Sequence, residues 1–184
     1  MQHSSPFADH LRFLKALITR PKSIGALLPS SPALGAAMAR QIILPGPVLE
    51  LGPGTGAITA EILAHGVTDL TCVEYDAAFA RALKCRFPDV RVVEGDAFDL
   101  AQTLGPHGAF SAVLSGLPLL NFPVAARHRL IEGALTCLAP GGAFVQFSYG
   151  AGPPVAPPPG YIVTKAVTVW ANLPPARVWV YRRA

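Results

Sequence analysis

The chain has 184 residues, of which 51% are hydrophobic and only 14% are charged, with a formal net charge of +4. This length suits one domain with a core of its own. No run of about 18 uncharged apolar residues occurs, so we expect no membrane span. Charged side chains within the first 20 residues argue against a secretory signal. Cys72, Cys85 and Cys137 lack C-x-x-C spacing, which indicates free thiols in a reducing cytosol and no metal site.

The positive charge is concentrated near the N-terminus. Residues 1–40 contain five basic side chains and one acidic side chain, whereas residues 41–184 contain ten of each. A nucleic-acid enzyme would be expected to spread its basic surface along a groove. The sequence therefore predicts no nucleic-acid partner and favours contact between the N-terminal segment and an anionic surface.

An amphipathic helix is predicted at the N-terminus, beginning near Pro6 and ending at Pro21. Its two faces separate apolar from polar side chains, with Phe7, Leu11, Leu14, Leu17 and Ile18 opposite Asp9, Arg12, Lys15, Thr19 and Arg20. The helix could pack on the rest of the protein with its basic face in water. It could instead lie in a membrane interface with its basic residues at anionic headgroups, or alternate between the two. We predict a membrane-binding helical segment over residues 1–40 and a second unit over residues 41–184.

Short apolar runs alternate with helical patterns in the second unit. Strands are expected at 47–51, 70–74, 90–94, 110–114 and 142–148, and helices at 57–65, 77–87 and 124–138. Such a pattern predicts a parallel sheet covered on both faces. Residues 150–160 contain five prolines and three glycines and are expected to form a loop. After it, 161–170 and 177–181 are predicted to form an antiparallel pair that completes the sheet.

A glycine-rich loop, VLELGPGTGAIT at residues 48–59, follows the first predicted strand and opens a helix. Gly52, Gly54 and Gly56 would permit a tight turn and close approach of a ligand to the backbone. The G-x-G-x-G spacing differs from that of dinucleotide sites, and Glu50 would repel a pyrophosphate. A turn without a ligand is one interpretation. The other is a site for a cationic ligand that carries an ammonium and a sulfonium.

Acidic residues also follow the second and third predicted strands. Glu74, at the end of its strand, could accept two hydrogen bonds from a ribose diol, and Asp76 is expected to cap the next helix. Asp96 could accept from an adenine amine, while the Ala97 N–H serves a ring nitrogen. Each acid alone could be a solvated loop residue. Ligand groups at three successive strand ends favour a nucleoside site.

Together, ELGPGTG, VEYD and EGDA resemble the first three cofactor motifs of the class I S-adenosylmethionine-dependent methyltransferases, over about residues 45–150. The resemblance implies an α/β, Rossmann-like fold with a seven-stranded, mostly parallel sheet whose last strand is antiparallel. It also implies S-adenosyl-L-methionine as the cofactor. The implied cofactor-binding residues are Glu50, Gly52, Gly54, Gly56, Glu74, Tyr75, Asp96, Ala97 and Ser115.

The loop after the fourth predicted strand, SGLPLLNFP at residues 115–123, would face the methyl group in that superfamily. Enzymes that methylate base amino groups often carry Asn or Asp, two prolines and an aromatic residue there. Here Ser115, Gly116 and Leu117 precede Pro118, and Leu119 replaces the aromatic residue on which a flipped base would stack. This argues against an rRNA adenine methyltransferase, which remains an alternative together with a small-molecule N-methyltransferase and a cofactor-binding membrane module without catalysis.

Segments 13–31, 115–123 and 172–183 resemble the bacterial phospholipid N-methyltransferases. This resemblance implies a cytoplasmic enzyme that binds the inner face of the cell membrane reversibly, at anionic headgroups. We expect it to be a monomer. The resemblance also implies a substrate, phosphatidylethanolamine, which is methylated in up to three steps to phosphatidylcholine.

Methyl transfer from a sulfonium requires a neutral amine held in line with the methyl carbon. An alkylammonium has a pKa of about 10, and burial in an apolar pocket lowers it. We expect the carbonyls of residues 115–117 and the Tyr149 hydroxyl to accept the proton. The Tyr149 ring could also face the cation, or simply pack. Lys22 and Arg177 are candidates for binding the phosphodiester. Asn121, in the loop at residues 115–123, could also bind the substrate.

Overall fold

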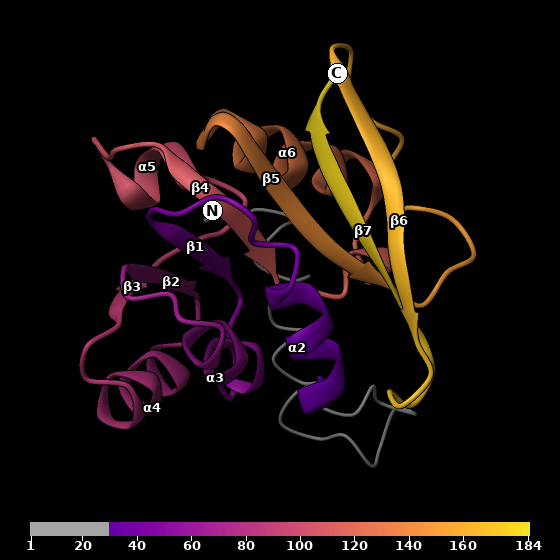
Figure 1. Cartoon of the computed structure of the whole chain (residues 1–184). Helices are drawn as coiled ribbons and strands as arrows, with labels where there is room; N and C mark the ends of the chain where they lie inside the picture. The colour runs from indigo at the N-terminus through magenta and orange to yellow at the C-terminus, as the bar shows by residue number, and fades with distance from the viewer. Residues whose placement is uncertain (1–29) are drawn as a thin grey trace, which may run out of the picture.

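The fold is an α/β sandwich with one central sheet, described for residues 30–184 by a computed structural model (Figure 1). Within that range the sheet has seven strands in the order β3-β2-β1-β4-β5-β7-β6. β1 to β5 are parallel, and β7 runs antiparallel to both β5 and β6. The predicted fold class is confirmed. The strands are β1 (Val48–Leu51), β2 (Leu70–Glu74), β3 (Arg91–Glu94), β4 (Phe110–Ser115), β5 (Leu138–Ser148), β6 (Tyr161–Val169) and β7 (Ala176–Arg183).

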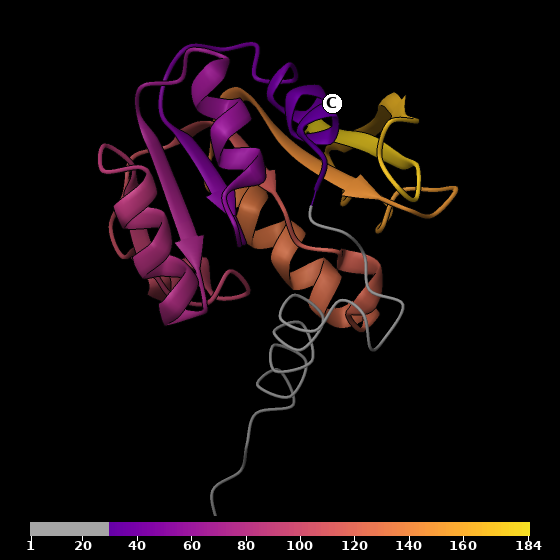
Figure 2. The same cartoon turned by 90° about the horizontal axis from the view of Figure 1, so that it is seen from below.

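Helices cover both faces of the sheet (Figure 2). One apolar core packs α2, α3 and α4 against one face, and a second core packs α5 and α6 against the other. Every residue of β1, β2 and β4 is buried, which explains their mostly apolar sequences. The helices are α2 (Pro32–Ala39), α3 (Ala57–Ala64), α4 (Ala77–Arg86), α5 (Leu100–Leu104) and α6 (Val124–Thr136), with a 3-10 turn, η2, at Leu119–Asn121.

Helix α2 was not predicted, because its sequence PALGAAMA is apolar throughout and shows no helical periodicity. Ser31 caps it by accepting the Leu34 N–H, and Pro32 occupies its first turn. Leu34 and Met38 are fully buried. Residues 32–39, which the sequence grouped with the N-terminal segment, therefore lie in the core of the α/β unit. The predicted amphipathic helix and Lys22 lie outside the described residues.

The fifth strand is longer than predicted and irregular at its start. Phe110 of β4 pairs with Leu138, and the next pair joins Ala112 to Ala143. The intervening Pro140-Gly141-Gly142 segment bulges from the sheet, and Gly141 has a positive φ of 78°. The strand therefore begins at Leu138, before the predicted range of 142–148.

The ends of β1, β2, β3, β4 and β5 lie at one edge of the sheet, which we call the carboxyl edge. Because β6 runs in the same direction as β5, the hairpin that joins β6 to β7 also turns at this edge (Figure 1). The motifs identified in the sequence follow these strand ends. The fold therefore gathers them on one side of the molecule.

Candidate active site

Glu50 lies in β1, completely buried, two residues before the glycine-rich loop. Its Oε2 accepts hydrogen bonds from the Thr59 hydroxyl at 2.7 Å and from the Cys72 thiol at 3.4 Å. Its Oε1 has no partner among the described residues. Burial raises the pKa of Glu50 to about 7, and the nearby carboxylate of Glu74 adds to the rise. An unpartnered buried carboxylate oxygen favours a cationic ligand at this place.

The glycine-rich loop depends on backbone conformations that suit glycine. Gly52, Gly54 and Gly56 have φ values of 65°, 55° and 80°. A Cβ on Gly52 would clash with the Leu117 Cδ2, and one on Gly56 would lie 2.7 Å from the Phe87 ring. A Cβ on Gly54 would meet no protein atom within 4 Å. Gly52 and Gly56 therefore let the side chains of Leu117 and Phe87 pack against the loop, whereas the space above Gly54 is open.

Glu74 connects the ends of two strands. Its Oε2 accepts the Gly54 N–H and its Oε1 accepts the Asp76 N–H, both at 2.9 Å. Burial raises the pKa of Glu74, and these two hydrogen bonds oppose the rise. A carboxylate has about four lone-pair positions, so two remain for hydroxyl donors of a ligand. The adjacent Tyr75 is 51% exposed at the same edge.

The turn after β3 is ordered by its own side chains. The Asp96 Oδ1 accepts the Phe98 N–H at 2.8 Å, and the Asp96 backbone exchanges two hydrogen bonds with the Thr103 hydroxyl. Ala97 is 8% exposed. Asp76 caps α4, as predicted, by accepting the N–H groups of Ala78 and Phe79. Asp96 thus follows the end of β3 at the same edge as Glu74.

The loop after β4 closes over the glycine-rich loop. A Cβ on Gly116 would lie 2.7 Å from the Gly52 carbonyl oxygen, and the Leu117 side chain covers Gly52. The Ser115 hydroxyl is fully buried and accepts the Leu117 N–H at 3.3 Å. The Leu117 carbonyl accepts the Gln146 Nε2 at 2.9 Å. Strand β5 therefore fixes the direction of a carbonyl that the sequence proposed as a proton acceptor.

Tyr149 follows β5 and is half-buried. Its ring packs edge-on against Phe147 at 5.4 Å, and Asn172 lies close to its phenol. Burial raises the pKa of Tyr149, so the phenol stays protonated near neutral pH. Arg177 donates to the Gly150 carbonyl at 2.9 Å beside it.

The structure brings the predicted cofactor residues together at the carboxyl edge, with Tyr149 and Arg177 beside the end of β5. Asn121 ends the turn η2 and is exposed.

The sequence did not identify three polar residues that organise this edge. Gln146 is fully buried and its Oε1 has no partner among the described residues. It is the one amide within the apolar run GAFVQFS, and this pattern could have identified it as a buried polar residue. Asn172 is 3% exposed and accepts the Ser31 N–H. Arg127 donates to the carbonyls of Leu120 and Phe122 and so holds the loop after β4, which no motif indicated.

These groups fit S-adenosylmethionine. The unpartnered oxygen of Glu50 suits positive charge, Glu74 has two free acceptor positions for a diol, and the space above Gly54 is open to a ligand. Among residues 30–184, no cluster of three or more His, Cys, Asp or Glu side chains could hold a metal ion. Nor does any helix in that range have the length and apolar character needed to cross a membrane.

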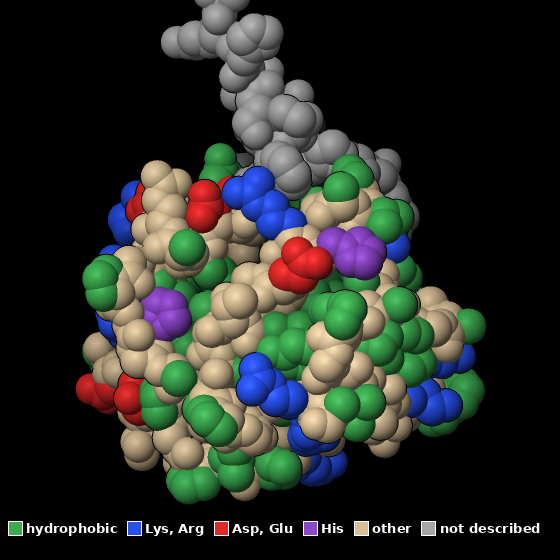
Figure 3. All heavy atoms as spheres, turned by 90° about the horizontal axis from the view of Figure 1, so that it is seen from above, with side chains coloured by type: hydrophobic (Ala, Val, Ile, Leu, Met, Phe, Trp, Pro, Cys, Tyr) green, Lys and Arg blue, Asp and Glu red, His purple; other side chains and the backbone are tan. Residues whose placement is uncertain are grey.

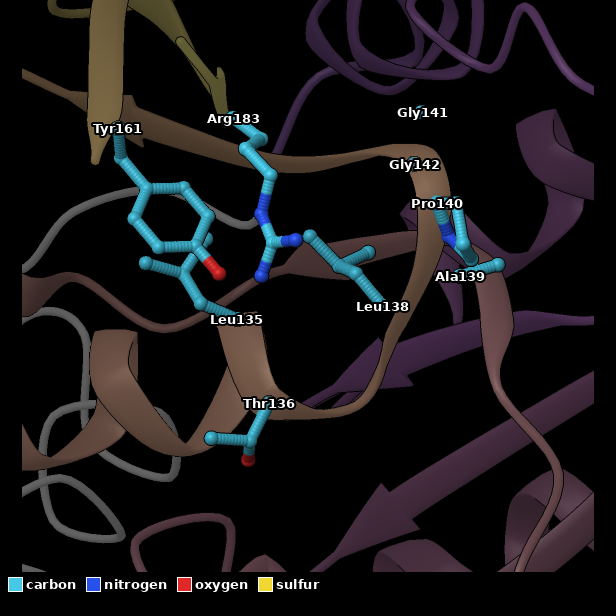
Figure 4. Close-up of a pocket in the computed structure, with 9 residues that line it drawn as sticks. All are labelled: Leu135, Thr136, Leu138, Ala139, Pro140, Gly141, Gly142, Tyr161 and Arg183. Carbon is cyan, nitrogen blue, oxygen red and sulfur yellow. The ribbon is translucent and has the colours of Figure 1, made fainter.

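A pocket of about 360 Å³ lies at the opposite edge, where the strands begin. Tyr161 and Arg183 point into it beside the start of β5 (Figure 4). None of the residues that line it belongs to the predicted site. It is therefore separate from the groups described above.

The model of the methyltransferase domain family matches residues 48–142. An ornithine lipid N-methyltransferase of Singulisphaera acidiphila is 38% identical over 149 residues, which cover 76% of this chain and 78% of that protein. A ribosomal RNA small subunit methyltransferase A of Synechococcus sp. is 43% identical over 74 residues, but these cover only 35% of this chain and 26% of that protein.

Among solved structures, TrmN from Thermus thermophilus has the same fold, with a TM-score of 0.64 and 21% identity. The match covers 83% of this chain and 49% of TrmN. The family match spans the glycine-rich loop, Glu74, Asp96 and the loop after β4, which the fold brings to one edge. The chain therefore belongs to the class I S-adenosylmethionine-dependent methyltransferases.

Proposed function

We propose that this enzyme methylates the primary amine of a membrane aminolipid. Similarity to a lipid N-methyltransferase along most of both chains carries the proposal. Phosphatidylethanolamine, methylated stepwise to phosphatidylcholine, is the substrate that the sequence motifs imply. Ornithine lipid is the substrate named for the relative. Both present a primary amine on a headgroup with two acyl chains, and both are candidates here.

The loop after β4 supports a lipid substrate. Between Ser115 and Asn121 it offers four apolar side chains, and Leu120 is partly exposed at the surface. Val124, at the start of α6, is 61% exposed. Apolar side chains at this loop suit contact with acyl chains. After Pro118, where an aromatic residue would stack on a flipped base, the loop has Leu119.

The bound cofactor would supply a methyl group on a sulfonium. The residues of this chain have to hold a neutral amine in line with it. An apolar surrounding favours the neutral amine, and the Leu117 carbonyl, held by Gln146, can accept a hydrogen bond from the nitrogen. The protonated Tyr149 phenol can accept through its oxygen, and its ring can face a methylated ammonium.

Within the cofactor site, we assign Glu50 and the three loop glycines to the methionine part. Glu74 is assigned to the ribose, with Tyr75 beside it, and Asp96 and Ala97 to the adenine. Arg177 and Asn121 are assigned to the headgroup.

The Glu74 assignment gives a direct prediction. Replacing Glu74 with glutamine should weaken S-adenosylmethionine binding by about 10- to 100-fold, because the amide NH₂ cannot accept hydrogen bonds and would face an N–H group. Isothermal calorimetry measures the change. Glu94→Gln, at the exposed end of β3, is the matched control and should bind within about twofold of the wild type. Equal affinities for all three proteins would place the ribose elsewhere.

We also propose that the enzyme is cytoplasmic and associates with the inner face of the membrane through its N-terminal segment. The five basic side chains of residues 1–40 support this. Each basic residue contributes about 1 kcal/mol to binding at an anionic surface.

The proposed activity can be tested with purified full-length protein and radiolabelled S-adenosylmethionine. Phosphatidylethanolamine, ornithine lipid and ribosomal RNA are supplied separately, with both lipids in detergent micelles. We expect label in one or both lipids, at the amine, identified by mass spectrometry. Label in RNA alone, or in neither lipid, would contradict the proposal. Label in only one lipid identifies the substrate.

A further inference from the structure

The turn between β6 and β7, residues 170–175, carries the two most exposed large apolar side chains of the described range. Trp170 is 77% exposed and Leu173 is 70% exposed. We call this segment, WANLPP, the hairpin tip, and it contains no charged residue. Removing such side chains from water is favourable in proportion to their apolar area, so this surface favours an apolar partner.

The hairpin tip lies beside the active site. Arg177 of β7 pairs with Ser148, the last residue of β5, so the tip extends beyond the carboxyl edge (Figure 1). Asn172 within the tip lies close to the Tyr149 phenol. A surface that binds the tip would therefore also face the residues proposed to bind the headgroup.

The base of the tip is fixed while its two apolar side chains point outward. The buried Asn172 accepts the Ser31 N–H at 3.1 Å and donates to the Pro174 carbonyl at 2.8 Å. Ala176, at the start of β7, is fully buried. These contacts hold the turn against the beginning of α2. Trp170 and Leu173 are thus presented from an ordered turn, with little conformational entropy left to lose on binding.

Charge distinguishes the kind of apolar partner. Residues 133–184 contain Lys165, Arg177, Arg182 and Arg183 and no acidic residue. Of these, Arg177 lies next to the tip, whereas Arg182 and Arg183 lie at the opposite edge. The edge opposite the site instead shows acidic and basic side chains scattered among apolar ones (Figure 3). An anionic bilayer matches an apolar tip that has Arg177 at its base and no acidic residue on either strand, since tryptophan favours the membrane–water interface and basic residues favour anionic headgroups.

We propose that the hairpin tip inserts Trp170 and Leu173 into the interface of an anionic bilayer and so docks the active site on its lipid substrate. The choice of a membrane as the partner rests on the proposed function. The tip adds a second contact beside Ser31, where the predicted N-terminal membrane segment joins the described domain. Docking at this edge would bring a headgroup amine to the loop after β4 without removing the lipid from the bilayer.

Tryptophan fluorescence tests the insertion directly. The chain has two tryptophans, and Trp179 is buried at 8% exposure, so Trp170 dominates any change on binding. Vesicles that contain phosphatidylglycerol should shift the emission to shorter wavelength, and brominated acyl chains should quench it. Trp170→Phe should lose both responses. An unshifted, unquenched Trp170 under conditions where the protein sediments with vesicles would overturn the proposal.

Affinity and activity give a second, independent readout. Trp170→Ala with Leu173→Ala should weaken vesicle binding by about tenfold. The matched control is Ile43→Ala with Ile162→Ala, because these exposed apolar residues lie toward the opposite edge, and it should bind like the wild type. The tip variant should retain methyl transfer to micellar lipid and lose it on vesicles. Equal losses in both assays would contradict docking, whereas quenching of Trp170 without any lipid methylation would refute only the proposed function.

Discussion

Replacing Gly54 with alanine is expected to abolish S-adenosylmethionine binding while the protein remains folded. A Cβ at this position meets no protein atom within 4 Å, so the substitution creates no steric conflict inside the protein. The new methyl group would instead project into the space that we assign to the cofactor. Even a partial overlap there should reduce affinity by about 100-fold or more. Calorimetry and thermal unfolding measure the two effects separately.

Gly66 provides a matched control for the backbone cost. Its φ is also positive, at 95°, and its Cβ would likewise meet nothing within 4 Å, but it follows α3 away from the site. Both alanine variants should lose roughly 1–2 kcal/mol of stability from the left-handed backbone. Only Gly54→Ala should lose cofactor binding. Normal binding by Gly54→Ala would show that the ligand does not approach this loop.

The sequence predicted the strands well, and it placed the motif residues at one common edge, because both depend on local patterns. Buried parallel strands have mostly apolar sequences, and a glycine-rich loop after such a strand predicts a tight turn that opens a helix. The motif residues from Glu50 to Ala97 all lie at strand ends, whose common edge follows from parallel topology.

What the sequence missed depends on contacts between distant segments. The uniformly apolar α2 has no periodicity to reveal that it packs on α3. Gln146 holds a carbonyl 29 residues away, and Arg127 holds the loop after β4 through backbone atoms alone. Backbone carbonyls are present in any sequence, so no residue pattern indicates which ones an arginine or amide will contact.

A pH-dependent stability difference is expected for Glu50→Gln. The pKa of Glu50 is about 7 in the folded protein against 4.5 for a free side chain. Between these values the folded state retains a proton that the unfolded state has released. The free energy of unfolding of the wild type should therefore fall as the pH rises through this window, by about 3 kcal/mol relative to the glutamine variant. Urea unfolding from pH 4.5 to 8 measures this, with Glu132→Gln, an exposed acid on α6, as the charge control.

The same substitution should weaken the cofactor complex, for the opposite electrostatic reason. A cation beside the buried Oε1 stabilises the ionised carboxylate, so wild-type affinity should increase as the pH rises through 7. Glu50→Gln has no charge to offer and should bind about tenfold less tightly at pH 8. The affinity of Glu50→Gln, measured over the same pH range, corrects for titration of the ligand's amino group. If Glu50→Gln is more stable than the wild type at high pH and also binds the cofactor less tightly, the ionised carboxylate destabilises the folded protein and stabilises the complex. If affinity were unchanged at every pH, the buried carboxylate would have no part in holding the cofactor.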